Sequence, residues 1–229
     1  GPASRLPLTA RLEQAFAARL AGLDADARHA LLLAALEDGE LPELGRDPDW
    51  RPAVAAGLGS ADNGTFRFRH PLIRSAVAQV ATTEERRRAH AELAEGLAHD
   101  PDRAVWHRAA VVGAGFHEAV AKELDQAAER ARLRGGRDVA LAALERAAAL
   151  SVDPEARALR LFRAGELAVE LGRADDSGRL LRAAQQLGLP QPERALASFG
   201  VEVFEPTWSG AATVRSFAGI AQELADAGR

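Results

Sequence analysis

Residues 58–73 read Leu-Gly-Ser-Ala-Asp-Asn-Gly-Thr-Phe-Arg-Phe-Arg-His-Pro-Leu-Ile, and this stretch decides the fold of the first part of the chain. Asn63-Gly64 is a strong hairpin signal, because a type I′ turn needs two residues that accept positive φ. After the turn, two phenylalanines alternate with two arginines, as a strand with one buried and one solvated face requires. His70-Pro71 then begins a helix, since proline is tolerated in a first helical turn. The stretch predicts a β-hairpin at about 58–69 that leads directly into a helix.

Helical hydrophobic spacing precedes this hairpin. Leucines and other apolar residues that recur every three or four positions predict helices over about 9–22 and 24–36. A third, short helix is predicted over about 49–57, with Pro52 in its first turn. Three helices, a small β-wing and a following helix are typical of a winged-helix unit, which we assign to residues 1–98.

The remainder of the sequence has helical periodicity throughout, and its later part repeats. Setting Gly136 on Gly172, a shift of 36 residues, places Leu144 on Leu180. A period of about 34–37 residues, with alanine at the helix contacts, is typical of a tetratricopeptide-like (TPR-like) array. We therefore predict α-hairpin repeats over residues 99–229 and an all-α fold apart from the wing. Because no polar capping repeat is visible at the end, we expect the array to be truncated there.

Composition excludes several classes of function. The 229-residue chain has a net charge of -4, which argues against a nucleic-acid surface spread over it. Cysteine is absent, so there is no disulfide framework and no cysteine nucleophile, and a cytoplasmic location fits. The longest apolar run, residues 30–36, is far shorter than the roughly 20 residues of a membrane span. Methionine is also absent and the chain begins Gly-Pro-Ala-Ser, so we expect a piece of a longer protein.

The sequence contains no pattern that predicts catalysis or metal binding. The G-x-x-x-x-G-K-[ST] phosphate loop is missing around Lys122, the only lysine. His117 and Glu118 begin like a zinc-protease motif, but Ala121 stands where the second histidine is required. The basic run at residues 86–88 spreads over a wide arc of its helix and is interpreted as a solvated face. We therefore expect neither an enzyme nor a metal centre in this chain.

Several stretches, taken in this order, resemble the large ATP-binding transcription regulators of the LuxR family, which are MalT-like signal-transducing ATPases. The resemblance covers nearly the whole chain. It is carried by Leu6-Pro-Leu-Thr-Ala-Arg-Leu-Glu-Gln-Ala-Phe16, Phe66-Arg-Phe-Arg-His-Pro-Leu-Ile-Arg-Ser-Ala-Val77, Glu85-Arg-Arg-Arg-Ala-His90, Asp100-Pro-Asp-Arg-Ala-Val-Trp-His107 and Ala127-Ala-Glu-Arg-Ala-Arg-Leu-Arg-Gly-Gly136.

The resemblance implies an architecture. In that family a nucleotide-binding module precedes the winged helix, and helical repeats then lead to a C-terminal DNA-binding helix-turn-helix. This chain would be the middle of such a protein. Its partners would then be the nucleotide-binding module of the same polypeptide and an inducer, protein or small molecule, on the repeat surface. ATP or ADP would be bound by the longer protein, and no cofactor, nucleic acid or membrane is expected to bind this chain directly.

The same resemblance gives His70 a role. The junction at residues 68–72 is similar to the Met-His-Asp motif of signal-transducing ATPases, whose histidine contacts the phosphate of bound ADP in the inactive state. His70 would match that histidine, whereas Pro71 replaces the usual aspartate. The residues themselves leave open a second interpretation, in which His70 is a capping or packing residue.

A second class of function also fits the predicted order of units. In SARP-type activators, a DNA-binding winged helix is followed by a TPR-like activation domain. The predicted third helix argues against this alternative, because Arg51 is almost the only side chain in it that could read a base edge.

Overall fold

The computed structural model describes residues 19–37, 41, 48–204, 217–222 and 225–226. Most of the predicted helix at 9–22 and most of the expected last helix at about 210–227 lie outside these residues. The chain forms two compact units, Gly1–Val111 and Val112–Arg229. The division lies after residue 111, whereas the predicted boundary lies after residue 98. The helix Pro101–Val112, which we predicted to belong to the repeats, therefore lies almost entirely in the first unit.

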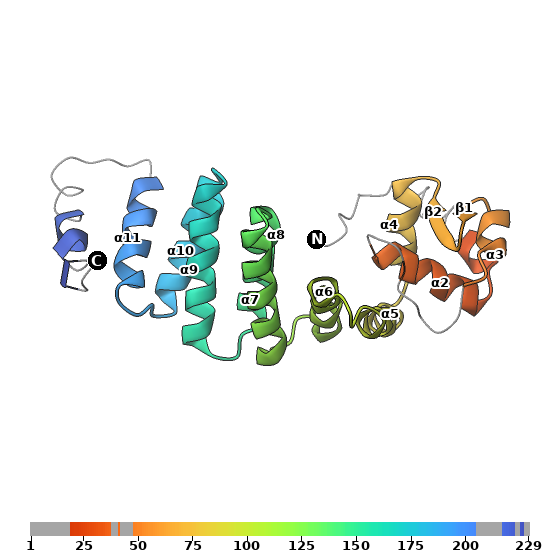
Figure 1. Ribbon diagram of the computed structural model, residues 1–229, viewed down its shortest axis with the longest axis horizontal. Coiled ribbons are helices and arrows are strands. Elements are labelled where there is room, and N and C mark those ends of the chain that lie inside the picture. Colours follow the sequence, from red (N-terminus) through yellow and green to blue (C-terminus); the bar gives the residue numbers. More distant parts are fainter. Residues whose placement is uncertain (1–18, 38–40, 42–47, 205–216, 223–224, 227–229) are drawn as a thin grey trace. The chain divides into compact units, whose positions relative to one another are not determined.

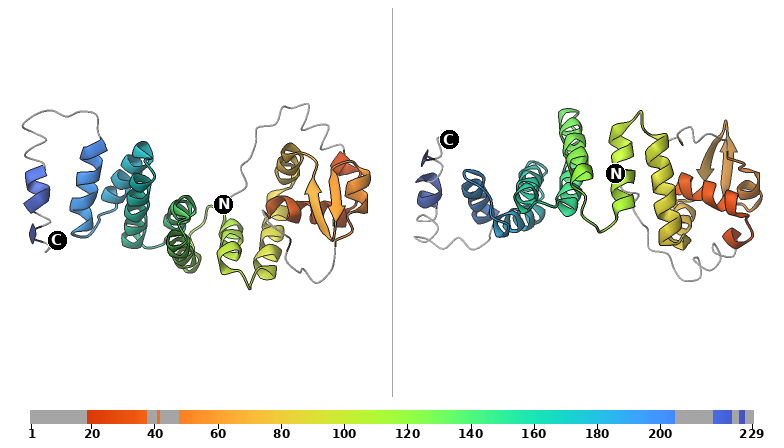
Figure 2. Two further views of the ribbon diagram at one scale, coloured as in Figure 1. Left: turned by 45° about the horizontal axis from the view of Figure 1, so that its top comes forward. Right: turned by 90° about the horizontal axis from the view of Figure 1, so that it is seen from below.

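The first unit contains helices on both sides of a β-hairpin (Figures 1 and 2). In chain order its elements are α2 (Ala25–Leu36), α3 (Arg51–Ala55), β1 (Gly59–Asp62), β2 (Thr65–Phe68), α4 (Pro71–Val80), α5 (Thr83–Gly96) and α6 (Pro101–Val112). The strands pair antiparallel with Asp62 opposite Thr65, and the two residues between them, Asn63 and Gly64, have φ values of 47° and 78°. The predicted hairpin is confirmed, and its turn has the positive φ angles that the Asn-Gly pair predicts.

The wing is attached to α3 by aromatic residues. Trp50 is buried, and its indole Nε1 donates to the main-chain oxygen of Gly64 at 2.8 Å. Its ring stacks on Phe66 with the centroids 5.0 Å apart. At Gly59 a Cβ would lie 2.5 Å from the Phe66 ring and 2.2 Å from the carbonyl oxygen of Arg67, so this position accepts only glycine. These contacts fix the hairpin and thereby the start of α4.

The second unit consists of paired helices that stand side by side in Figure 1. They are α7 (Glu118–Leu133), α8 (Arg137–Leu150), α9 (Pro154–Glu170), α10 (Ala174–Gln186) and α11 (Glu193–Phe204), and each packs against the next. From residue 69 onward, the described part of the chain contains no strand. The predicted fold class is confirmed: an all-α chain with one small β-hairpin, in which a winged-helix unit is followed by TPR-like α-hairpin repeats.

The repeat has a register of 37 residues between its first two hairpins, so the predicted shift of 36 is wrong by one. Gly135 and Gly172 end α7 and α9 with φ values of 80° and 70°. The residue after each glycine donates to an equivalent alanine oxygen, Gly136 to Ala131 and Arg173 to Ala168, both at 2.8 Å. Leu144 therefore matches Leu181 and not Leu180. Two successive glycines follow α7, and the sequence does not show which of them takes the positive φ.

Small residues bring the repeat helices close together. Leu181 of α10 fits against Gly165 of α9 and Gly200 of α11. A Cβ at Gly165 would lie 2.7 Å from a Leu181 methyl carbon, and one at Gly200 would lie 2.6 Å from the other. Because real Cβ atoms do not approach so closely, both positions need glycine for the three helices to pack as they do.

Candidate functional site at the wing-to-helix junction

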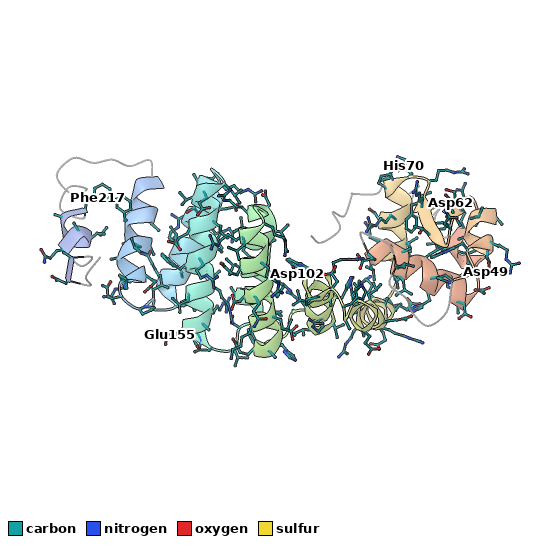
Figure 3. All side chains as sticks on the ribbon, in the orientation of Figure 1. Asp49, Asp62, His70, Asp102, Glu155 and Phe217 are labelled. Atoms are coloured by element: carbon teal, nitrogen blue, oxygen red, sulfur yellow. The ribbon has the colours of Figure 1, made fainter. Side chains whose placement is uncertain are left out.

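His70 lies between β2 and α4, where it is the N-cap residue of the helix (Figure 3). Its backbone is extended, with φ -147° and ψ 142°, and its ring Nδ1 accepts a hydrogen bond from the Leu72 amide at 3.1 Å. Pro71 follows in the first helical turn. Because Nδ1 accepts, the neutral ring carries its hydrogen on Nε2. The side chain is exposed, so Nε2–H is a donor at the N-terminus of a ten-residue helix.

Two arginines of the wing are exposed close to His70 in the chain. Arg67 lies on the solvated face of β2, and the Arg69 amide extends the hairpin ladder by donating to the Leu58 oxygen at 3.0 Å. Arg74, by contrast, turns inward. Its guanidinium donates to the main-chain oxygens of Ala35 at 2.9 Å and of Glu37 at 2.8 Å. Arg74 thus fixes α4 to the end of α2.

A second histidine in the chain caps a helix in the same way. His117 is exposed and precedes α7, and its Nδ1 accepts from the Val120 amide at 3.3 Å. Capping through Nδ1 is therefore a structural role that histidine has twice in this chain. His117 lies in the other unit and is a matched control for His70.

The third helix of the winged unit offers little for reading DNA. α3 has five residues, and its Arg51 side chain binds the carboxylate of Asp49 through two hydrogen bonds of 2.9 and 2.8 Å. The hydrogen bond from the Arg51 side chain is the main reason why the pKa of Asp49 falls to about 2. In the basic run at 86–88, the Arg86 guanidinium donates hydrogen bonds to the carbonyl oxygens of Ala78 and Ala81 at the end of α4.

The structure also contains a polar group that no sequence pattern predicts, here called the Glu37 cluster. It consists of the buried Glu37 and His107 and the partly buried His90 and Arg103. The Glu37 carboxylate lies 2.9 Å from His107 Nε2 and 3.0 Å from an Arg103 guanidinium nitrogen. His107 Nδ1 lies 2.9 Å from His90 Nδ1. Burial alone would raise the pKa of Glu37, but the hydrogen bonds from His107 and Arg103, together with their charges, outweigh it and lower this pKa to about 2. Glu37 and His107 are 70 residues apart, so no local motif indicates their contact.

Arg160 forms a second buried polar centre, in the repeat unit. Its guanidinium donates to Asp125 at 2.8 Å, to the Ser151 hydroxyl at 2.6 Å and to Glu118 at 2.9 Å. The hydrogen bond from Arg160 is the largest cause that lowers the pKa of Glu118. These contacts join α7, α9 and the turn after α8.

The described residues were also compared with the requirements of a metal site and of a membrane span, and they meet neither. Among them, no group of three or more histidine, cysteine or acidic side chains is arranged to hold a metal ion. No helix in the same part of the chain is long and apolar enough to cross a membrane.

The comparisons with known proteins give one match. No family model matches the chain, and no curated protein does so. Among solved structures, the chain is similar to a signal transduction ATPase with numerous domains (STAND) from Pyrococcus horikoshii that carries a tetratricopeptide repeat sensor, with 14% sequence identity and a TM-score of 0.37. The match covers 99% of this chain and 42% of that protein, so the chain spans less than half the length of the structure it matches.

Proposed function

We propose that this chain is the regulatory and interaction segment of a LuxR-type, ATP-dependent transcription regulator. In this role it links a nucleotide-binding module to a C-terminal DNA-binding helix-turn-helix, both of which lie outside residues 1–229 of the same cytoplasmic polypeptide. The observation that carries the proposal is the order of parts. A wing ends in Phe-Arg-His-Pro-Leu at residues 68–72, its histidine caps the next helix, and α-hairpin repeats follow. The quoted family stretches occur in the same order along the sequence.

The proposal divides the work between segments. The chain itself catalyses no reaction and holds no cofactor, whereas the nucleotide-binding module binds ATP or ADP. The repeats present a surface to an inducer, which is a protein or a small molecule. The winged unit contacts the nucleotide-binding module and responds to the nucleotide bound there.

His70 is the residue that we assign to nucleotide sensing. Its ring is exposed and caps α4 through Nδ1, which leaves Nε2–H to donate to an anion, so one ring can serve both roles. The N-terminus of α4 adds its own preference for negative charge. In the closed, ADP-bound state, Nε2 would donate to an ADP phosphate.

The test is an ADP and ATP titration of the longer protein, comparing wild type with His70→Asn. Asparagine retains an N-cap acceptor but does not reach as far as Nε2. A hydrogen bond to a charged group contributes roughly 1.5–3 kcal/mol, so we expect His70→Asn to weaken ADP binding about 10- to 150-fold. ATP binding should change less, because a ligand shifts an equilibrium only through its different affinities for the two states.

His117→Asn is the matched control, since it changes the other capping histidine, in the repeat unit. It should leave both nucleotide affinities unchanged. Equal ADP affinities for wild type and His70→Asn would show that His70 is a cap alone, and the sensor role would be abandoned.

The SARP-type alternative requires DNA binding by this winged helix. The shortness of α3 and the pairing of Arg51 with Asp49 favour the LuxR-type proposal. We expect the 229-residue chain to show no sequence-specific binding to its own promoter at physiological salt, where specific sites usually bind at about 10⁻⁸–10⁻¹¹ M. A salt-dependent gel shift at nanomolar protein that is lost in Arg51→Ala would favour the SARP-type activator instead.

A further inference from the structure

The Glu37 cluster places strict limits on where hydrogens can lie. The side chains of Glu37 and His107 are 5% and 8% exposed, so water gives them little help in forming hydrogen bonds. An ionised carboxylate only accepts hydrogen bonds. The contact between Glu37 and His107 Nε2 therefore requires a hydrogen on Nε2 in every charge state of the cluster.

The contact between the two imidazoles also limits the number of protons that the histidine pair can hold. A hydrogen bond between two Nδ1 atoms 2.9 Å apart holds one hydrogen. Either His107 is neutral and His90 donates, or His107 is a cation and His90 accepts. If both rings were cations, two N–H groups would point at each other. The pair therefore accommodates one extra proton with the contact intact, but a second only when the contact breaks.

The charged groups around the pair also favour one extra proton and oppose a second. Glu37, at the end of α2, supplies a negative charge that favours one proton on the pair. Arg103 on α6 carries a positive charge that opposes a second one, and Asp100 lies 3.9 Å from it. From α4, Arg74 donates to the main-chain oxygen of Glu37.

A carboxylate on α5, that of Glu92, is engaged by a different histidine. Glu92 accepts a hydrogen bond from His29 of α2 at 2.6 Å. Thus α2, α4, α5 and α6 all contribute polar groups to this region, and Glu37 is the carboxylate that contacts His107.

The position of α6 makes the cluster important. Besides His107, its buried side chains are Ala104, Val105 and Ala109, which are at most 1% exposed. The polar contacts of His107 with Glu37, at the end of α2, and with His90, in the middle of α5, add to this apolar packing in positioning α6.

We propose that the Glu37 cluster is an acid-sensitive latch, which holds α6 against α2 and α5 and opens when the histidine pair takes up its second proton. This inference goes beyond the proposed function and stands without it. The open state binds one more proton than the closed state. Opening therefore increases with falling pH once the pair holds its first proton, because from that point only the open state takes up another.

The experiment is hydrogen–deuterium exchange of the 229-residue chain between pH 8 and pH 5, corrected for the intrinsic pH dependence of exchange. One linked proton changes the opening equilibrium by up to about tenfold per pH unit. We expect α6 amides to lose protection at up to this rate toward the acid end of this range, while amides of α8 and α9 keep theirs. A constant ratio of protection between α6 and α8 over this pH range would overturn the proposal, with no variant needed.

His90→Asn sharpens the test. The asparagine side chain can place a donor or an acceptor where Nδ1 of His90 lies, so it satisfies His107 in either charge state. We expect the variant to keep α6 protected and to lose its pH dependence. His99→Asn, at an exposed position in the turn between α5 and α6, is the matched control and should retain the wild-type profile. An unchanged pH dependence in His90→Asn would overturn the latch.

Discussion

The winged unit and the repeat unit are each stabilised internally by a different kind of contact. In the winged unit, single contacts join dissimilar residues, such as Trp50 with Gly64 and Glu37 with His107, at sequence separations of 14 and 70. In the repeat unit three ion pairs recur at nearly constant separations. Arg137 pairs with Glu170, Arg179 with Glu145 and Arg160 with Asp125, at separations of 33, 34 and 35. These three ion pairs therefore follow the repeat that the sequence displays, whereas the contacts named in the winged unit follow no repeat.

The regular separations also have an energetic meaning. Each repeat places its charged side chains on the next repeat, so the stability of one hairpin depends on its neighbour. The winged unit instead relies on a few contacts that each occur once. Substitutions in the two units should therefore reduce stability in different ways.

The largest effect is expected for Leu144→Ala. Leu144 is 2% exposed in the centre of α8, and removal of a buried leucine side chain costs about 2–5 kcal/mol of the free energy of unfolding. Leu181, its partner in the 37-residue register, should show a loss of similar size. Leu133→Ala is the control, because Leu133 is 72% exposed. Urea denaturation measures all three, and a loss below about 0.5 kcal/mol at Leu181 would contradict the register.

Next in size is Arg160→Met. Removing one partner of a buried ion pair costs about 3–5 kcal/mol, and the partial exposure of the two carboxylates places this variant near the lower limit. The matched variant is Arg137→Met, whose ion pair with Glu170 is about half exposed and should contribute about 1 kcal/mol or less. Equal losses of unfolding free energy in the two variants would show that the burial of Arg160 does not increase the contribution of its ion pairs to stability.

Much of the fold could be predicted from the sequence because its signals are local. The Asn63-Gly64 turn, the proline starts of α4, α6 and α9, and the periodic alanines each depend on a few neighbouring residues. The register of the repeat failed by one residue for a physical reason. Gly135 and Gly136 both tolerate positive φ, and only the hydrogen bond to Ala131 shows which of them ends the helix.

The polar sites could be predicted only in part. His70 was found because its role depends on its immediate neighbours, and capping remains compatible with the proposed sensing of nucleotide. The Glu37–His107 and Arg160–Glu118 contacts bring together side chains 70 and 42 residues apart, which do not follow the repeat spacing. His107 lies in the middle of α6, and nothing near it in the sequence indicates that Glu37 faces it.

The third effect is a difference in acid sensitivity between wild type and Glu37→Gln. At pH 7 the variant should lose about 1.5–3 kcal/mol, the usual contribution of hydrogen bonds to a charged group. The pKa of Glu37 is lowered from 4.5 to about 2, so its contribution is complete above pH 4.5 and is lost as the pH falls toward 2. The difference between the two proteins should therefore shrink over this range. Urea denaturation at several pH values checks it, and a constant difference would contradict the assigned contacts.

The smallest effect is expected at His70 in the 229-residue chain itself. His70→Ala removes the acceptor that caps α4 and should cost about 1 kcal/mol, whereas His70→Asn retains an acceptor and should stay within about 0.5 kcal/mol of wild type. His117→Ala should behave like His70→Ala, with a smaller loss because its hydrogen bond is longer, at 3.3 Å. Urea denaturation at pH 8, where histidine is largely neutral, makes the comparison.

Equal losses in His70→Ala and His70→Asn would mean that the ring acts through packing and not through Nδ1. If His70→Asn keeps the stability of wild type, any change that it causes in ADP affinity arises from the lost Nε2–H and not from a damaged helix. The smallest stability effect in the chain therefore decides how the nucleotide titration is to be interpreted.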